Sequence, residues 1–253
     1  MWVMRTLLGV AVLVALSARG GLAPGPRVPV LVELFTSEGC SSCPPADALL
    51  ESLQREQPVE GAEIIPLGLH VDYFNHLGWK DSFSSSSYTA RQQDYSRVFG
   101  PDSVYTPQIV VDGREPLAGN KDDVIRRAIA SAAGRPHLPL HVTARATDGK
   151  VRLTIDLPAA PANTERILLV AAITEDGLTS IVKRGENNGR TLRHVAVARS
   201  VQRLDALTGA SSVVERPLGI ARGWGPNGLK AVVWLQGVNS RRVYGAAAAS
   251  IVK

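Results

Sequence analysis

The sequence predicts two domains: an α/β domain over residues 27–135 and a β-rich, sandwich-like domain over residues 136–253. Before residue 136, apolar runs typical of buried strands alternate with segments whose apolar residues recur at helical spacing. After it, short alternating segments follow one another without a helical apolar stripe, a pattern typical of an antiparallel sandwich. The change of pattern at residues 134–139 therefore predicts a domain boundary there.

The first domain is expected to contain seven elements in the order strand, helix, strand, helix, strand, strand, helix. The run over residues 29–35 is almost continuously apolar, as in a strand that is covered on both faces. The next helix starts at a cysteine pair, and Ala46, Leu50 and Leu53 lie on one of its faces. The remaining elements are expected at residues 64–71, 87–99, 108–111, 116–118 and 120–133.

The second domain is expected to contain strands only. Residues 138–145 and 151–157 alternate around Asp148-Gly149, which is typical of a hairpin. Further strands are expected at residues 167–174, 181–184, 194–201, 230–235 and 243–251.

Residues 1–23 have the composition of a secretory signal peptide. Arg5 precedes an apolar segment over residues 6–16, and small residues lead to Ala23, where we expect cleavage. The apolar segment is shorter than the roughly 20 residues of a membrane span, although an uncleaved signal anchor is the alternative. We therefore expect a periplasmic or secreted protein that has no membrane contact after cleavage.

The charge of the chain does not indicate a nucleic-acid-binding protein. The formal net charge is +5, and the basic residues are scattered without a lysine or arginine run. A nucleic-acid footprint would concentrate them in a patch or stripe. We expect no nucleic-acid partner.

The chain has two cysteines, in the string Cys40-Ser41-Ser42-Cys43. A crosslink that closes so short a loop removes little entropy from the unfolded chain, so chemistry explains the pair better than stapling does. A cysteine at a helix N-terminus gains thiolate character. We therefore expect Cys40 to be the exposed attacking thiol and Cys43 the resolving thiol, with capture of a metal by both as the alternative.

Three further features bear on this pair. Thr106-Pro107 directly precedes a strand, where an X–Pro bond can be cis. Glu33 interrupts an apolar strand, which requires either an ion pair with an arginine of the second domain or a role as proton shuttle for Cys43. His70 together with the two cysteines would suit Cu(I). Zinc would need four ligands and the chain has no second cysteine pair, so outside the copper alternative we expect no metal and no cofactor.

Together these residues resemble the thioredoxin-like superfamily over roughly residues 28–135. The strings 35–45, 70–73, 105–107 and 185–192 look like a narrower family of exported bacterial thioredoxin-like proteins whose function is unknown. The resemblance implies a mixed sheet flanked by helices, with Tyr105, Thr106 and Pro107 facing the cysteines as the edge on which a partner docks. Gly39 precedes Cys40 where ordinary thioredoxins have tryptophan.

The function expected from these observations is thiol–disulfide exchange with protein thiols and disulfides in the periplasm. Whether the protein turns over substrate as an enzyme is left open. A copper-delivery protein that uses the same cysteines is one alternative. A non-catalytic binding module on a thioredoxin scaffold is the other.

Overall fold

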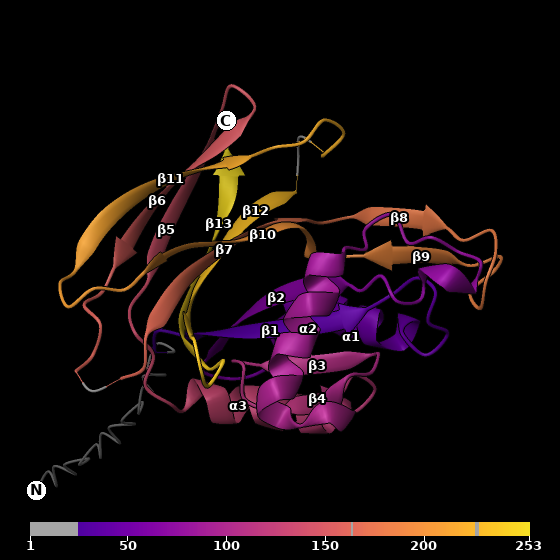
Figure 1. The fold of residues 1–253 in the computed structure, drawn as a ribbon, viewed down its shortest axis with the longest axis horizontal. Coiled ribbons are helices and arrows are strands. Elements are labelled where there is room, and N and C mark those ends of the chain that lie inside the picture. The colour runs from indigo at the N-terminus through magenta and orange to yellow at the C-terminus, as the bar shows by residue number, and fades with distance from the viewer. Residues whose placement is uncertain (1–24, 163, 226–227) are drawn as a thin grey trace, which may run out of the picture.

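The computed structural model describes residues 25–162, 164–225 and 228–253, and shows one large mixed sheet with three α-helices in that part of the chain (Figure 1). The expected signal peptide over residues 1–23 lies outside the described residues. The helices are α1 (Pro44–Glu56), α2 (Ser86–Phe99) and α3 (Asp122–Ala133), with 3₁₀ turns at Asn75–Leu77 and Pro101–Ser103. No helix in the described part is long and apolar enough to cross a membrane.

The strands come in the following chain order. They are β1 (Val28–Thr36), β2 (Ala62–His70), β3 (Gln108–Val111), β4 (Pro116–Ala118), β5 (His141–Thr147), β6 (Lys150–Leu157), β7 (Ile167–Glu175), β8 (Leu178–Ile181), β9 (Thr191–His194), β10 (Val197–Ala206), β11 (Ser212–Gly219), β12 (Leu229–Gly237) and β13 (Val243–Val252). Eleven of them form one sheet in the order β11-β6-β5-β13-β12-β7-β10-β2-β1-β3-β4, and β8 pairs only with β9.

The N-terminal part contains the seven expected elements in the expected order. β1 is parallel to β2 and antiparallel to β3, and β4 is antiparallel to β3. Val30, Val32 and Leu34 on one face of β1 pack with α1 and α3. Leu31 and Phe35 on the other face pack with α2. β1 is therefore buried on both faces, which explains its continuous apolar run.

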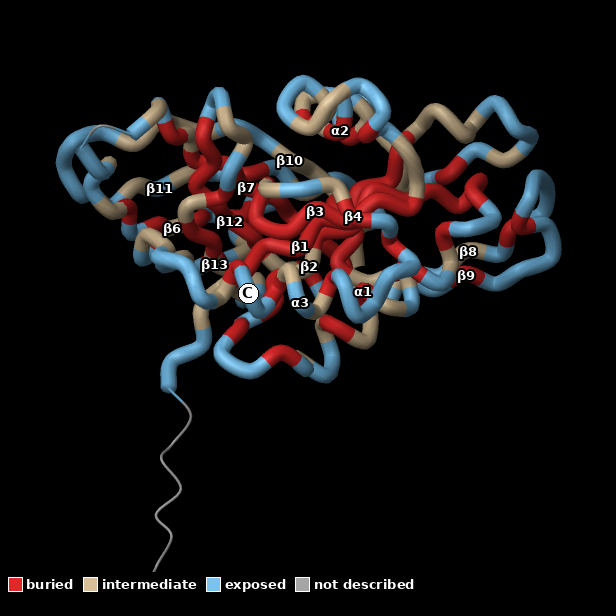
Figure 2. Tube along the Cα trace, turned by 90° about the horizontal axis from the view of Figure 1, so that it is seen from below, coloured by how far each residue is buried: buried red, intermediate tan, exposed pale blue. Residues whose placement is uncertain are grey.

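The prediction of two separate domains, one α/β and one sandwich, is wrong. β10 joins the edge of β2 through the pair Val197 and Gly68, and the other strands of the second half extend the same sheet from there. The backbones approach closely at this junction, because a Cβ atom on Gly68 would lie 3.3 Å from the carbonyl oxygen of Val195. One apolar core includes Phe35 of the first half and Trp234 of the second, and buried segments of strands from both halves gather in the middle of the molecule (Figure 2).

The curvature of the sheet explains this error. Residues of β6 and β7 share one apolar core although three strands separate them in the sheet. The second half therefore curls on itself, and each strand buries one face against strands further along the same sheet. An alternating sequence reports that one face of a strand is buried, but not whether the covering strands belong to another sheet.

Candidate active site

The two cysteines lie at the N-terminal end of α1 and form a disulfide, with Cα atoms 5.4 Å apart. Cys43 directly precedes the first helical residue, Pro44. The carbonyl of Cys43 accepts hydrogen bonds from the N–H groups of Ala46 and Asp47 at 2.9 and 3.1 Å. Pro44 and Pro45 have no N–H and those of Ala46 and Asp47 are engaged by Cys43, so only the helix dipole favours negative charge, and hence a thiolate, at this end of α1.

Both cysteines are buried, so the expectation of an exposed Cys40 is wrong for the disulfide form. Cys40 is 2% and Cys43 0% exposed, whereas Ser41 and Ser42 between them are exposed. The hydroxyl of Ser42 lies 3.4 Å from Cys40 Sγ. Local sequence could not show this burial, because the loop that covers Cys40 comes from the second half of the chain.

That loop joins β8 to β9, and we call residues 182–190 the capping loop. Asn187 is fully buried, and its side-chain Nδ2 donates hydrogen bonds to the carbonyls of Glu38 and Cys40, both at 2.9 Å. The carboxylate of Glu186 accepts one from the N–H of Ser41 at 2.9 Å. β9 also packs against α1, and the β8–β9 pair projects beside it (Figure 1). The capping loop therefore holds the backbone around Cys40.

Of the expected docking segment, Tyr105, Thr106 and Pro107, the proline lies near the first turn of α1. The Thr106-Pro107 bond is cis. A Cβ atom on Gly119 would lie 2.8 Å from Pro107 Cβ and 2.9 Å from Ala46 Cβ, so the proline and the helix meet around this glycine. The carbonyl of Tyr105 accepts a hydrogen bond from α2. The docking role of the segment stays a prediction.

Glu33 lies on the face of β1 that α2 covers, opposite the face that packs against α1. It alternates in register with Leu31 and Phe35, which pack toward α2. Its carboxylate accepts hydrogen bonds from Arg91 Nε at 2.6 Å and from the hydroxyl of Tyr95. The expected ion pair is present, but its arginine comes from α2 and not from the second half. The proton-shuttle role stays a prediction that this placement does not favour.

Titratable side chains gather next to the cysteines, and we call this group the disulfide cluster. His70 Nδ1 lies 2.7 Å from Asp81 Oδ2, and His194 Nε2 lies 3.3 Å from Glu38 Oε1. The centroids of the two imidazole rings are 4.8 Å apart. The cluster consists of Glu38, Asp47, His70, Asp81 and His194. Sequence reasoning singled out His70 but missed Asp81 and His194, because neither lies in a motif with the cysteines.

Burial and mutual charge shift the pKa values in the cluster. Burial raises the pKa of Asp47 to about 6, against the opposing charges of His194 and His70. Burial alone would lower the pKa of His70, but the charge and hydrogen bond of Asp81 hold it above its ordinary value. Burial would likewise raise the pKa of Asp81, and His70 together with two backbone N–H groups holds it below its ordinary value.

The copper alternative finds no built site in this geometry. In the described residues, no group of three or more His, Cys, Asp or Glu side chains is arranged to hold a metal ion. His70, the ligand that the sequence suggested, directs Nδ1 to Asp81.

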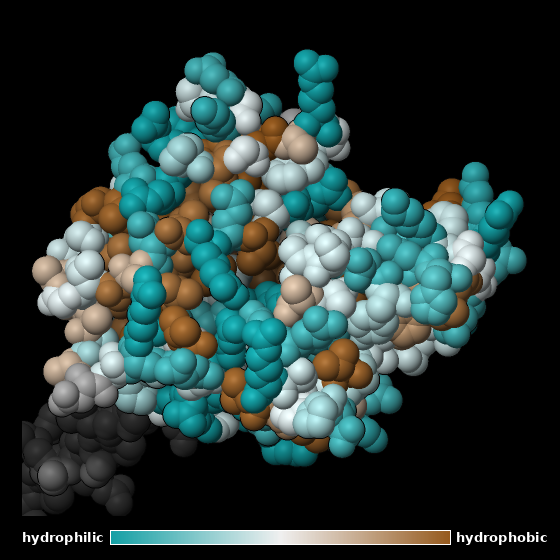
Figure 3. All heavy atoms as spheres, viewed as in Figure 1, coloured by the Kyte–Doolittle hydropathy of each residue, from teal (hydrophilic) through white to brown (hydrophobic). Residues whose placement is uncertain are grey.

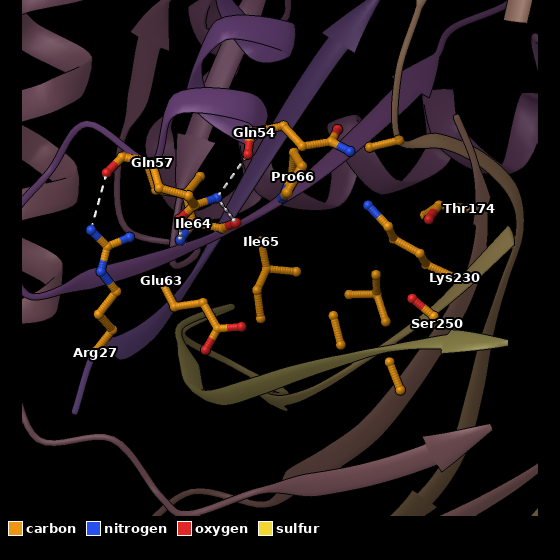
Figure 4. Close-up of a pocket in the computed structure, with 14 residues that line it drawn as sticks. Arg27, Gln54, Gln57, Glu63, Ile64, Ile65, Pro66, Thr174, Lys230 and Ser250 are labelled. Carbon is orange, nitrogen blue, oxygen red and sulfur yellow. Dashed lines mark hydrogen bonds between the residues drawn. The ribbon is translucent and has the colours of Figure 1, made fainter. Parts of the chain in front are cut away.

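A cavity of about 360 Å³ lies between β2 and the strands β12 and β13 (Figure 4). The outer edge of β2 is blocked there, because the side-chain amide of Gln57 bonds both the N–H and the carbonyl of Ile64, and Pro66 has no N–H. Arg27 and Lys230 line opposite walls. None of its described lining residues is a cysteine or a histidine, so it offers no chemistry comparable to that of the disulfide.

Comparisons with known proteins place the chain in a family and support its fold. The family model described as "Protein of unknown function (DUF1223)" matches residues 31–236. The crystal structure of a protein from Agrobacterium tumefaciens is similar, with a TM-score of 0.68 and 28% identity over 88% of this chain and 94% of that chain. A domain of the outer membrane lipoprotein Omp28 from Porphyromonas gingivalis reaches a TM-score of 0.34 at 14% identity, over 46% of this chain and 89% of that domain, and carries no argument. No curated protein sequence matches the chain.

Proposed function

The chain belongs to the family described as "Protein of unknown function (DUF1223)", and from the chemistry of the site we propose that it is a thiol–disulfide oxidoreductase. Its partners would be protein thiols and disulfides in the periplasm or outside the cell. The observation that carries the proposal is the Cys40–Cys43 disulfide at the N-terminus of α1, with Pro107 against the same helical turn. On these residues we also propose kinship of the N-terminal part with the thioredoxin-like superfamily.

The proposed reaction is a pair of thiolate displacements. The thiolate of Cys40 attacks one sulfur of a partner disulfide, so that a mixed disulfide forms and the other partner sulfur leaves with the electron pair and takes up a proton. Cys43, after losing its proton, attacks Cys40 Sγ, the mixed disulfide breaks, and the second partner sulfur leaves as a thiolate. Once this second thiolate has also taken up a proton from solvent, the partner has gained two electrons and two protons, and the reverse sequence oxidises a partner dithiol.

The surroundings of Cys40 support its role as the attacking thiol. Ser42 places a hydroxyl 3.4 Å from Cys40 Sγ, where it can donate a hydrogen bond to a thiolate. The negative charge of Glu38 would oppose the thiolate, but Trp79 Nε1 donates a hydrogen bond to that carboxylate at 2.7 Å. The helix dipole and the Ser42 hydroxyl therefore favour a thiolate at Cys40, and the opposing charge of Glu38 is partly offset by its hydrogen bond from Trp79.

Substitution of each cysteine tests the proposal. With a dithiol as electron donor, the wild type is expected to turn over a peptide disulfide, and Cys40→Ser is expected to abolish turnover. Cys43→Ser is expected to accumulate a mixed disulfide through Cys40, which mass spectrometry of the trapped adduct identifies. Wild-type protein that leaves peptide disulfides unchanged, or an adduct through Cys43 in Cys40→Ser, would contradict the assignment.

A further inference from the structure

The capping loop is tightly built over Cys40. Backbone hydrogen bonds from Val182 N–H to the Arg190 carbonyl and from Gly189 N–H to the Val182 carbonyl, at 2.9 and 2.8 Å, close the loop on itself. Gly185 has a φ of +75°, and a Cβ atom there would lie 3.2 Å from Trp79 Cβ. The loop thus packs against the same tryptophan that binds Glu38.

In this closed arrangement the disulfide is almost inaccessible to a partner. In thiol–disulfide exchange the attacking thiolate must contact one sulfur of the disulfide, and the other sulfur then leaves. The rate therefore depends on how accessible the attacked sulfur is. Cys40 is 2% exposed while Asn187 sits fully buried on its carbonyl. With the capping loop in this position, almost no surface of Cys40 is open to a polypeptide.

Two features of the capping loop favour its opening. β8 and β9 pair with each other and not with the eleven-stranded sheet, so opening the loop breaks no strand pairing of the main sheet. Asn187 Oδ1 is buried without a hydrogen-bond partner among the described residues. A buried unsatisfied acceptor is unfavourable, so the closed loop is held less firmly than its two hydrogen bonds alone would hold it.

We propose that Asn187 is a positioning residue that latches the capping loop over Cys40, and that a partner gains access by displacing this loop. The inference rests on the proposed function. The partner is a polypeptide segment around the reacting cysteine, since its main chain can replace the lost contacts. It would offer N–H donors to the carbonyls of Glu38 and Cys40 and a carbonyl to the N–H of Ser41.

Reduction of the disulfide by dithiothreitol measures access without a physiological partner. A dithiothreitol thiolate attacks Cys40 Sγ, the bond to Cys43 breaks, and Cys43 leaves with the electron pair and takes a proton. The second dithiothreitol sulfur then closes its ring and releases Cys40. Two electrons pass to the protein, and the rate reports how often Cys40 is uncovered.

Asn187→Asp keeps the size of the side chain but removes its N–H donors, and Asn188→Asp makes the same change at the exposed neighbour. Loss of two hydrogen bonds of typical strength predicts reduction about 30-fold faster in N187D. N188D is expected within twofold of wild type. Glu186→Ala removes the single bond to Ser41 from an exposed side chain, and about fivefold is expected. If N187D does not fold, the reduction rate of E186A tests the proposal instead.

A second readout separates a latch from a merely structural role. Closed protein does not bind the peptide, so a larger closed fraction weakens the apparent affinity. N187D has a smaller closed fraction and is therefore expected to lower KM for a peptide disulfide, while kcat stays the same. N187D and E186A that are reduced as slowly as N188D would overturn the latch even if peptide turnover is observed. Faster reduction of N187D without any peptide turnover would support the latch and refute the proposed function.

Discussion

Two of the buried polar groups at which the halves of the chain meet differ in how completely they are satisfied. One, which we call the core cluster, consists of Glu33, Arg91, Tyr95 and Gln236. Arg91 pairs with Glu33 at 2.6 Å and donates to Gln236 Oε1 at 2.9 Å, and Gln236 Nε2 contacts the Tyr95 hydroxyl at 3.0 Å. The guanidinium also lies over the ring of Trp234, 5.0 Å from its centroid.

The disulfide cluster is left partly unsatisfied. Glu38 Oε1 and His194 Nε2 are 3.3 Å apart but not aligned for a hydrogen bond, and these atoms and His194 Nδ1 have no hydrogen-bond partner among the described residues. No polar side-chain atom of the core cluster is in that state. A satisfied buried network holds parts together, and an unsatisfied one persists where something else requires it. The core cluster therefore connects the two halves through satisfied contacts, whereas the disulfide cluster is the group that the proposed chemistry would use.

The largest effect is expected at the core cluster. Glu33→Gln leaves Arg91, which is 12% exposed, without its counter-charge. Removing one partner of a buried ion pair lowers the free energy of unfolding by about 3 to 5 kcal/mol, and urea unfolding measures the loss. The pH profile of peptide-disulfide exchange by the folded variant is expected to match that of the wild type, because Glu33 faces away from α1.

Glu215→Gln is the matched control, since its partner Arg152 lies in an exposed pair at 2.9 Å. It is expected to change stability by less than about 1 kcal/mol. A shifted exchange profile in Glu33→Gln, with Glu215→Gln unchanged, would show that Glu33 serves as the proton shuttle and that the core cluster takes part in the chemistry.

The difference between the clusters also explains what the sequence could predict. Sequence predicts Cys40, Cys43 and Pro107 as candidate site residues because the patterns that mark them are local: a short cysteine spacing, the start of a helix and the start of a strand. Glu33 was identified as anomalous, because a carboxylate in an apolar run needs a partner. Its partner Arg91 is 58 residues away, and no local pattern names such a partner.

Long-range contacts account for the remaining errors as well. Asn187 lies 147 residues from Cys40, and its loop contains the turn-forming residues of an ordinary connection. The surface around β8 and β9 is mostly hydrophilic (Figure 3), so hydropathy does not mark the loop either. The order of elements in the first half followed from periodicity, whereas the continuous sheet depends on the Val197–Gly68 junction, which strand patterns cannot reveal.

Within the disulfide cluster, Asp81→Asn is expected to lower stability by about 2 to 3 kcal/mol near pH 6. The lowered pKa of Asp81 stabilises the fold above the ordinary aspartate pKa, and this contribution is lost as the pH falls through the lowered value. The raised pKa of His70 contributes below the ordinary histidine pKa and is lost as the pH rises through the raised value. The loss is therefore expected to peak between about pH 4 and 6.5.

Thermal unfolding across pH checks this dependence, with Asp102→Asn at an exposed acid as the control. A loss that is the same at pH 6 and pH 9 would show that the His70–Asp81 pair is not charged, and that Asp81 acts only as an acceptor for backbone N–H groups.

The smallest effect has the opposite sign and concerns the acid closest to the cysteines along α1. Asp47 has a pKa of about 6 against an ordinary value of 3.8, so the folded protein binds a proton between these values that the unfolded chain does not. Stability therefore falls as the pH rises through this window. Asp47→Asn does not titrate, and we expect no effect at pH 4 and a gain of about 1 kcal/mol above pH 7, after allowance for partial exposure.

Asp122 is the matched control for Asp47, because it also lies in the first turn of a helix but is exposed and paired with Arg126 at 2.6 Å. Asp122→Asn is expected to lower stability slightly at pH 7, since a negative charge at a helix N-terminus is favourable. Opposite signs for the two variants would show that burial against the disulfide cluster, and not helix position, sets the behaviour of Asp47. If Asp47→Asn also lowers stability at pH 7, the cluster satisfies that carboxylate as fully as the core cluster satisfies Glu33, and the contrast between the two groups fails at this residue.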